Sequence, residues 1–120
     1  MKTPTRILVI DDDRVTRESV AEVLQEEGYE VAIAADGHDG IKQFTAFQPH
    51  LVLTDLQMPR VDGHGVIAPV QSVSPRTPII IFTAEIALDA KRRAEDLGIA
   101  GYLNKPFEFS DMFAQIEKAL

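Results

Sequence analysis

The stretch Ile-Leu-Val-Ile-Asp-Asp-Asp (residues 7–13) carries the strongest signal for the fold. Four apolar residues in a row, three of them β-branched, indicate a strand that is buried on both faces, as in a parallel sheet. Three aspartates follow immediately, at the point where such a strand leaves its sheet. The junction of a buried strand with an acidic run is therefore a candidate functional site.

Further along the chain, the pattern of residues 7–10 recurs in four short apolar runs, at residues 31–34, 51–53, 79–82 and 99–103. Segments with helical spacing of apolar residues separate or follow these runs, as at 16–24, 41–44, 87–97 and 109–120. Strands that alternate with helices predict a parallel sheet with helices on both faces. We expect an α/β, flavodoxin-like fold with five helices.

The order of the five strands can also be predicted. The run at 31–34 is preceded by Glu30 and diluted with alanine, and the run at 99–103 contains Gly101, which marks these two strands as the edges. The other three runs are continuously apolar and belong in the centre. A doubly wound, five-stranded sheet of order 2-1-3-4-5 fits, and its ligand site forms beyond the carboxyl ends of strands one and three.

Size and composition suit one small domain over residues 1–120. With 19 acidic and 12 basic residues the net charge is −7, which disfavours direct binding to nucleic acids or anionic membranes. The longest apolar runs are far shorter than the roughly 20 residues that a membrane-spanning helix needs. The chain has no cysteine. We expect a cytoplasmic protein.

Polar residues follow four of the predicted strands: Asp11 to Asp13, Asp55, Thr83, and Lys105 with Pro106. Each has an ordinary structural explanation when it is taken alone; Asp13, for example, could cap the following helix. Together they would meet at one crevice, where several carboxylates need a cation to stay ionised. Mg²⁺ is the most suitable ion, because it prefers oxygen ligands and is often completed by phosphate oxygens. A carboxylate at such a site can itself accept a phosphoryl group.

The same residues resemble the receiver domain of bacterial two-component response regulators, of the chemotaxis-regulator type. The resemblance rests on residues 7–13, on Leu-Thr-Asp-Leu-Gln-Met-Pro-Arg-Val-Asp-Gly (53–63), on Phe-Thr-Ala (82–84) and on Tyr-Leu-Asn-Lys-Pro-Phe (102–107). It extends over essentially the whole chain.

The resemblance implies a role for each matching residue. Asp55 would be the phosphoacceptor. Mg²⁺, or Mn²⁺, would be bound by Asp12 directly, by Asp11 through water, by Asp55, and by the backbone carbonyl of Gln57. Thr83 and Lys105 would bind phosphoryl oxygens, and the Lys105–Pro106 peptide would be cis. Gln57 and Glu85 occupy positions that tune the lifetime of the phosphate.

The resemblance also implies a switch and its partners. A sensor histidine kinase or a phosphotransfer protein would donate the phosphoryl group, so the domain would not be a conventional enzyme. Thr83 would then move towards the phosphate, and the ring of Tyr102 would turn into the vacated space. The altered surface, around residues 87–97, 99–103 and 109–120, would regulate a downstream effector protein or domain. We expect a monomer, with weak dimerisation after phosphorylation left open.

Three alternatives remain at this point. Asp11-x-Asp13-x-Val15 also resembles the nucleophile motif of haloacid-dehalogenase-like phosphohydrolases, although Asp55 would then have no role. A flavodoxin-like enzyme would need a phosphate-cradling loop where the aspartates lie. A receiver-shaped interaction module that is never phosphorylated would usually lack part of the acidic set.

Three further features of the sequence do not decide the function. Pro69 falls inside the expected third helix, which it should kink or shorten. The cluster Lys91-Arg92-Arg93 is either a solvated helix face or a partner contact. His38, His50 and His64 have no metal-ligand spacing, and we assign them no role.

Overall fold

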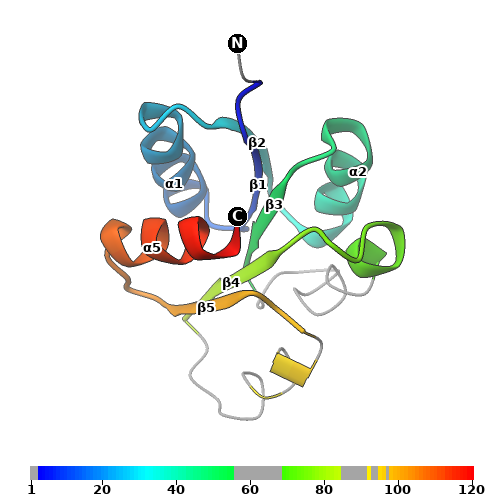
Figure 1. The fold of residues 1–120 in the computed structure, drawn as a ribbon. Helices are drawn as coiled ribbons and strands as arrows, with labels where there is room; N and C mark the ends of the chain where they lie inside the picture. Colours follow the sequence, from blue (N-terminus) through cyan, green and yellow to red (C-terminus); the bar gives the residue numbers. More distant parts are fainter. Residues whose placement is uncertain (1–2, 56–68, 85–91, 93–94, 97) are drawn as a thin grey trace.

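The computed structural model describes residues 3–55, 69–84, 92, 95–96 and 98–120. The strands are β1 (Arg6–Ile10), β2 (Glu30–Ala34), β3 (Leu51–Thr54), β4 (Ile79–Thr83) and β5 (Gly101–Asn104). The helices described in full are α1 (Arg14–Glu26), α2 (Gly37–Phe47) and α5 (Phe109–Ala119). Figure 1 shows these elements in their alternating order along the chain.

All five strands form one parallel sheet of order β2-β1-β3-β4-β5, which confirms the predicted topology. The register explains where the carboxyl ends meet. Ile10 pairs with Thr54, so the next residues, Asp11 and Asp55, leave the sheet side by side. The amide of Asp55 donates to the carbonyl of Ile10 at 2.9 Å, which extends this alignment by one step.

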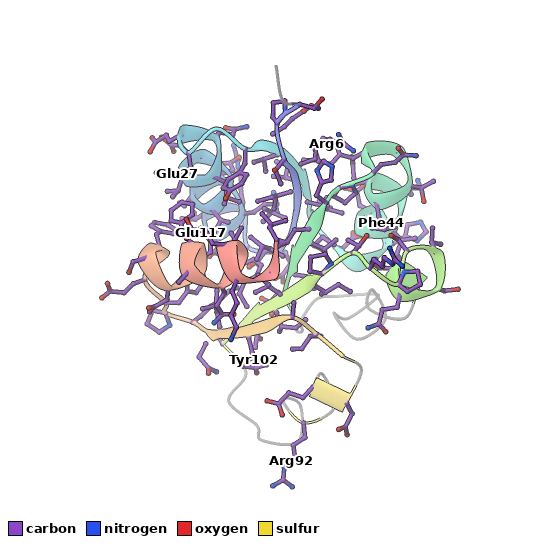
Figure 2. All side chains as sticks on the ribbon, viewed as in Figure 1. Arg6, Glu27, Phe44, Arg92, Tyr102 and Glu117 are labelled. Carbon is purple, nitrogen blue, oxygen red and sulfur yellow. The ribbon has the colours of Figure 1, made fainter. Side chains whose placement is uncertain are left out.

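The two faces of the sheet carry separate apolar clusters because side chains alternate along each strand. Ile7 and Val9 point to the face covered by α1 and α5, where Leu24 and Met112 join them. On the opposite face, Leu8 and Ile10 belong to a second cluster with Phe44 of α2. Figures 1 and 2 show this division, with α1 and α5 on one side of the sheet and α2 on the other.

The first helix begins directly after Asp13, the residue that the sequence offered as its cap, and extends beyond the predicted segment 16–24. Asp13 is its N-cap, with a side chain that accepts a hydrogen bond of 3.1 Å from the amide of Thr16. This cap satisfies an amide that has no partner within the helix. Gly28 follows the last turn with a φ of 94°, a conformation that favours glycine. Asp13 is thus committed to the start of α1.

The amino-terminal ends of β1 and β3 are tied to the end of α2 through Arg6. Its guanidinium donates to the carbonyls of Phe47 and Gln48, with the shortest bond at 2.9 Å. Its amide donates to Nδ1 of His50 at 2.9 Å, and the amide of His50 donates back to the carbonyl of Arg6 at 2.8 Å. His50, which was assigned no role in the sequence analysis, is therefore part of this link.

Two predicted helices fall partly outside the described residues. Residues 69–73 are helical, and Pro69 is the first described residue of that stretch. The kink expected at Pro69 stays a prediction. Residues 92, 95 and 96 are helical and lie where the fourth helix was expected. No helix in the described part of the chain is long and apolar enough to cross a membrane.

Candidate functional site

Four strands deliver one polar side chain each to the same edge of the sheet. Asp11 follows β1, Asp55 follows β3, Thr83 ends β4, and Lys105 follows β5. Asp11 and Thr83 are fully buried, and Asp55 is 5% exposed. Burial of three polar side chains in a domain of this size requires partners for each of them.

The ammonium group of Lys105 lies between two of the carboxylates. Its nitrogen is 2.5 Å from Oδ2 of Asp11 and 2.8 Å from Oδ2 of Asp55. The same nitrogen lies 5.0 Å from the centre of the Phe82 ring, so its remaining surroundings are partly apolar. The sequence placed Lys105 at this crevice but did not predict that it would bridge Asp11 and Asp55.

The charges at the site affect one another. Burial raises the pKa of Asp11 above its ordinary value, and the hydrogen bond from Lys105 opposes this effect only in part. Burial alone would lower the pKa of Lys105, but its hydrogen bonds to Asp11 and Asp55 and their charges outweigh that effect, so the pKa is raised. Lys105 therefore stays protonated as the positive charge of this site.

Asp12 completes an acidic cluster with Asp11 and Asp55. One carboxylate oxygen from each of the three lies within 4.8 Å of the others. Three carboxylates with the single ammonium of Lys105 leave an excess of two negative charges among these four side chains. One divalent cation would balance that excess, and an all-oxygen donor set suits Mg²⁺ or Mn²⁺. Asp12 is exposed and so accessible to an ion from solvent.

Arg17, which the sequence analysis did not single out, also reaches this region. Its Nη1 donates to the backbone carbonyl of Asp11 at 2.8 Å. Arg17 lies one helical turn after the N-cap Asp13, and a residue at that spacing can fold back over the start of α1. That spacing was the available signal. The guanidinium holds the main chain of Asp11 in place beside the acidic cluster.

The structure describes some of the remaining predicted site residues and not others. The Lys105–Pro106 peptide bond is cis. Tyr102 is half-buried and packs against the apolar cluster on the α2 face of the sheet. Gln57 and Glu85 lie outside the described residues, so their assigned roles stay predictions.

A hollow of about 450 Å³ borders the site between α1 and the segment that follows β5. Its lining is mostly apolar, with Val15, Ala84, Phe107 and Phe109 among the residues that form it, and Lys105 lies at its wall. Val15 is 72% exposed on the first turn of α1. The hollow gives a second molecule an apolar surface next to the acidic cluster.

Residues 7–117 match the family described as the response regulator receiver domain. The chain belongs to this family. Receiver domains are signalling domains of two-component response regulators, and the strand order and the acidic cluster of this receiver domain agree with the resemblance found in the sequence.

Curated relatives support the assignment. The receiver domain is 36% identical over 117 residues to response regulator MprA of Mycolicibacterium vanbaalenii, covering 98% of this chain and 51% of that protein. It is 40% identical over 118 residues to transcriptional regulatory protein PdtaR of Mycobacterium tuberculosis, covering 98% of this chain and 57% of that protein. The chain thus spans about half the length of the curated relatives it matches.

Solved structures agree with the fold. A response regulator receiver domain protein from Clostridium thermocellum superposes with a TM-score of 0.90 at 30% identity, covering 96% of this chain and 93% of that one. A CheY-like receiver domain protein from Methanospirillum hungatei superposes with a TM-score of 0.93 at 28% identity, covering 97% and 93%.

Proposed function

We propose that this receiver domain, formed by residues 1–120, accepts a phosphoryl group on the carboxylate of Asp55. The donor would be a phosphohistidine on a sensor histidine kinase or on a phosphotransfer protein. The observation that carries the proposal is the position of Asp55, which is 5% exposed, beside the ammonium of Lys105 and within an acidic cluster. Its carboxylate has both a nucleophilic oxygen and neighbours that can bind the transferred group.

The transfer forms one bond and breaks another. A carboxylate oxygen of Asp55 attacks phosphorus, the bond between phosphorus and the donor imidazole nitrogen breaks, and its electron pair stays with that nitrogen. The product is an acyl phosphate on Asp55. Charge gathers on the phosphoryl oxygens, so the Lys105 ammonium and the Thr83 hydroxyl would act as donors to them.

A divalent cation belongs to this proposal as a cofactor. Asp11, Asp12 and Asp55 would hold Mg²⁺ or Mn²⁺, with the carbonyl of Gln57 as a further ligand. The ion would supply positive charge to the phosphoryl oxygens during transfer. Arg17 donates to the main-chain carbonyl of Asp11, and the backbone amide of Asp13 donates to Oδ1 of Asp11 at 2.8 Å, so both contacts keep this carboxylate oriented towards the cluster.

The hollow between α1 and the segment after β5 supports docking of the donor. A phosphohistidine must approach Asp55 closely, and apolar surface next to the site would bury part of the donor protein. Val15 and Phe109 are exposed large apolar residues on this surface, and both border the hollow. The acidic cluster alone would repel a phosphorylated donor, so apolar contact and a bound cation would both assist the encounter.

Phosphorylation would then act as a switch. Thr83 would move towards the new charge, and the ring of Tyr102 would turn into the vacated space. Residues 87–97 with β5 and α5 would change their surface and regulate a downstream effector protein or domain, without direct binding to nucleic acid or membrane. Gln57 and Glu85 would tune the phosphate lifetime. We further propose a cytoplasmic monomer, with weak dimerisation after phosphorylation left open.

Intact mass spectrometry tests the proposal. The protein is incubated with a small acyl phosphate, with and without Mg²⁺, beside an Asp55→Asn variant. We expect a metal-dependent gain of one phosphoryl group in the wild type and none in the variant. Asp13→Asn is a matched control, because Asn also caps helices and Asp13 lies outside the acidic cluster. No gain in the wild type would instead favour an interaction module that is never phosphorylated.

A further inference from the structure

Gln115 on α5 makes a contact with β5 that the proposed function does not use. Its Nε2 donates a hydrogen bond of 3.1 Å to the backbone carbonyl of Tyr102. Gln115 and Tyr102 are 13 residues apart, and this bond joins the side chain of a helix to the main chain of the edge strand beneath it.

The surroundings of Gln115 favour one orientation of its amide. Its Oε1 is buried and has no hydrogen-bond partner among the described residues. A flipped amide would set this oxygen against the Tyr102 carbonyl, so the hydrogen bond fixes the orientation of the amide. The oxygen faces the α-carbon of Gly101, where only a weak C–H contact is available.

Gly101 makes room for this arrangement. A Cβ at residue 101 would overlap Oε1 of Gln115 and would lie 3.4 Å from Cγ1 of Ile80. The sequence analysis used Gly101 only as a sign of an edge strand. In the structure this glycine leaves space for the amide of Gln115 against β5.

The contact joins the two faces of the sheet. Gln115 lies over Gly101 on the face covered by α1 and α5, where Ile80 and Met112 belong to one apolar cluster. The ring of Tyr102 packs on the opposite face, against the cluster that contains Ile81. A side chain on one face therefore holds the main chain of a residue whose ring lies on the other.

We propose that Gln115 is a positioning residue that links the main chain of Tyr102 to α5, so that a change at Tyr102 is transmitted to the α5 surface. The inference rests on the proposed function, in which Tyr102 responds to phosphorylation of Asp55. It adds a physical route from that ring to the output helix. Such a route needs an element with two arrangements that both ends influence, and the amide bond provides the mechanical link.

Two labels can follow the two ends separately. The chain has two tyrosines, Tyr29 and Tyr102, and three methionines, of which Met112 lies buried on α5. Fluorotyrosine signals report on Tyr102, with Tyr29→Phe for assignment. Carbon-13 methionine methyl signals report on Met112, with Met112→Leu for assignment. Both are recorded before and after addition of Mg²⁺ with beryllium fluoride, an analogue of the phosphoryl group.

In the wild type we expect both signals to shift. In Gln115→Leu, which removes the donor and keeps an apolar helix former, the Tyr102 signal should still shift while the Met112 shift falls by about twofold or more. Gln115→Lys, which restores a donor on a long side chain, should recover part of the Met112 shift. Lys118→Leu, an exposed change on the same helix, should leave both shifts intact.

The outcomes separate the inference from the proposed function. Wild-type shifts of both signals that persist unchanged in Gln115→Leu would overturn the inference alone. A wild type that neither shifts nor gains a phosphoryl group would remove the proposed function and the inference with it. If Gln115→Leu does not fold, Gly101→Ala serves instead, because it displaces the amide and keeps Gln115; an unchanged Met112 shift there would equally overturn the inference.

Discussion

The ammonium of Lys105 forms an ion pair with Asp55, 50 residues away in the chain, at 2.8 Å. In the same position the ammonium also forms an ion pair with Asp11, so one positive charge is paired with two carboxylates. A cation that enters the cluster meets carboxylates already in contact with an ammonium. The lysine would therefore compete with the metal before transfer and assist it once a phosphoryl group adds negative charge.

Replacing Lys105 with Met separates these two effects. We expect phosphoryl uptake from a small acyl phosphate to slow by about a hundredfold, the loss typical of one donor to a developing charge. Mg²⁺ should bind about tenfold more tightly, because the ammonium no longer repels it. Mass spectrometric time courses and calorimetric Mg²⁺ titrations measure the two quantities. Lys105→Arg, which keeps the charge, is the control; equal uptake rates in wild type and Lys105→Met would contradict the assigned role.

Thr83 can be tested through its hydroxyl, because its side chain is fully buried at the end of β4. Thr83→Val keeps the shape and removes the hydroxyl, whereas Thr83→Ser keeps the hydroxyl. We expect the valine variant to lose the Tyr102 fluorine shift on addition of beryllium fluoride with Mg²⁺, and the serine variant to retain most of it. A full shift in the valine variant would show that the Tyr102 response does not depend on this hydroxyl.

Gly40 on α2 lies against the buried side chain of Ile10. Ile10 directly precedes Asp11, the first residue of the acidic cluster. A Cβ at residue 40 would lie 2.6 Å from Cδ1 of Ile10, a side chain that is fully buried in the core. We expect Gly40→Ala to lower the free energy of unfolding by about 1 to 2 kcal/mol, because overpacking outweighs the better helix propensity of alanine. Urea denaturation measures this loss.

The double variant Gly40→Ala with Ile10→Val is the control for that prediction. Valine lacks the Cδ1 atom that the new methyl group would meet, so the two changes should cost less together than the sum of their separate costs. Strict additivity would place the cause of the destabilisation elsewhere.

Tyr29 gives the stability of the fold a dependence on alkaline pH. It is half-buried beside the α1 and α5 cluster, and burial, followed by the charges of Glu117 and Glu27, raises its pKa above the ordinary value of 10.0. Figure 2 labels Glu117 on α5 and Glu27 at the end of α1. The unfolded chain ionises first as pH rises, so the contribution of Tyr29 to stability is complete below pH 10.0 and is lost above it.

Absorbance titration of tyrosinate in a Tyr102→Phe variant measures this pKa. Glu117→Gln should lower it but leave it above the ordinary value, since burial is the larger cause. A Tyr29 that titrates at its ordinary value in the folded protein would refute the prediction.

The sequence predicted four of the strands to within one residue because each is a short apolar run. The exception is β5, which was predicted at 99–103 and lies at Gly101–Asn104. Ile99 is apolar because it packs against the core cluster, and it does so from the segment before the strand. Burial and strand pairing produce the same apolar pattern, so a single sequence does not distinguish them.

The sequence predicted which residues gather at the site but not the contacts that they make. Residues after parallel strands must meet at one edge, so Asp11, Asp55 and Lys105 could be placed together from the sequence. That Lys105 would bridge both carboxylates depends on the length and direction of one flexible side chain. The contact of Gln115 with Tyr102 depends on how α5 packs on β5, which no local pattern encodes.

The link made by Arg6 gives the sheet a fixed end. The strands that carry Asp11 and Asp55 are fastened at their opposite ends by the bonds among Arg6, His50 and the last turn of α2. We expect these bonds to resist sliding of β1 against β3 when the carboxyl ends rearrange. Under the proposed function, a rearrangement that begins at Asp55 would then spread sideways across the sheet, towards β4 and β5.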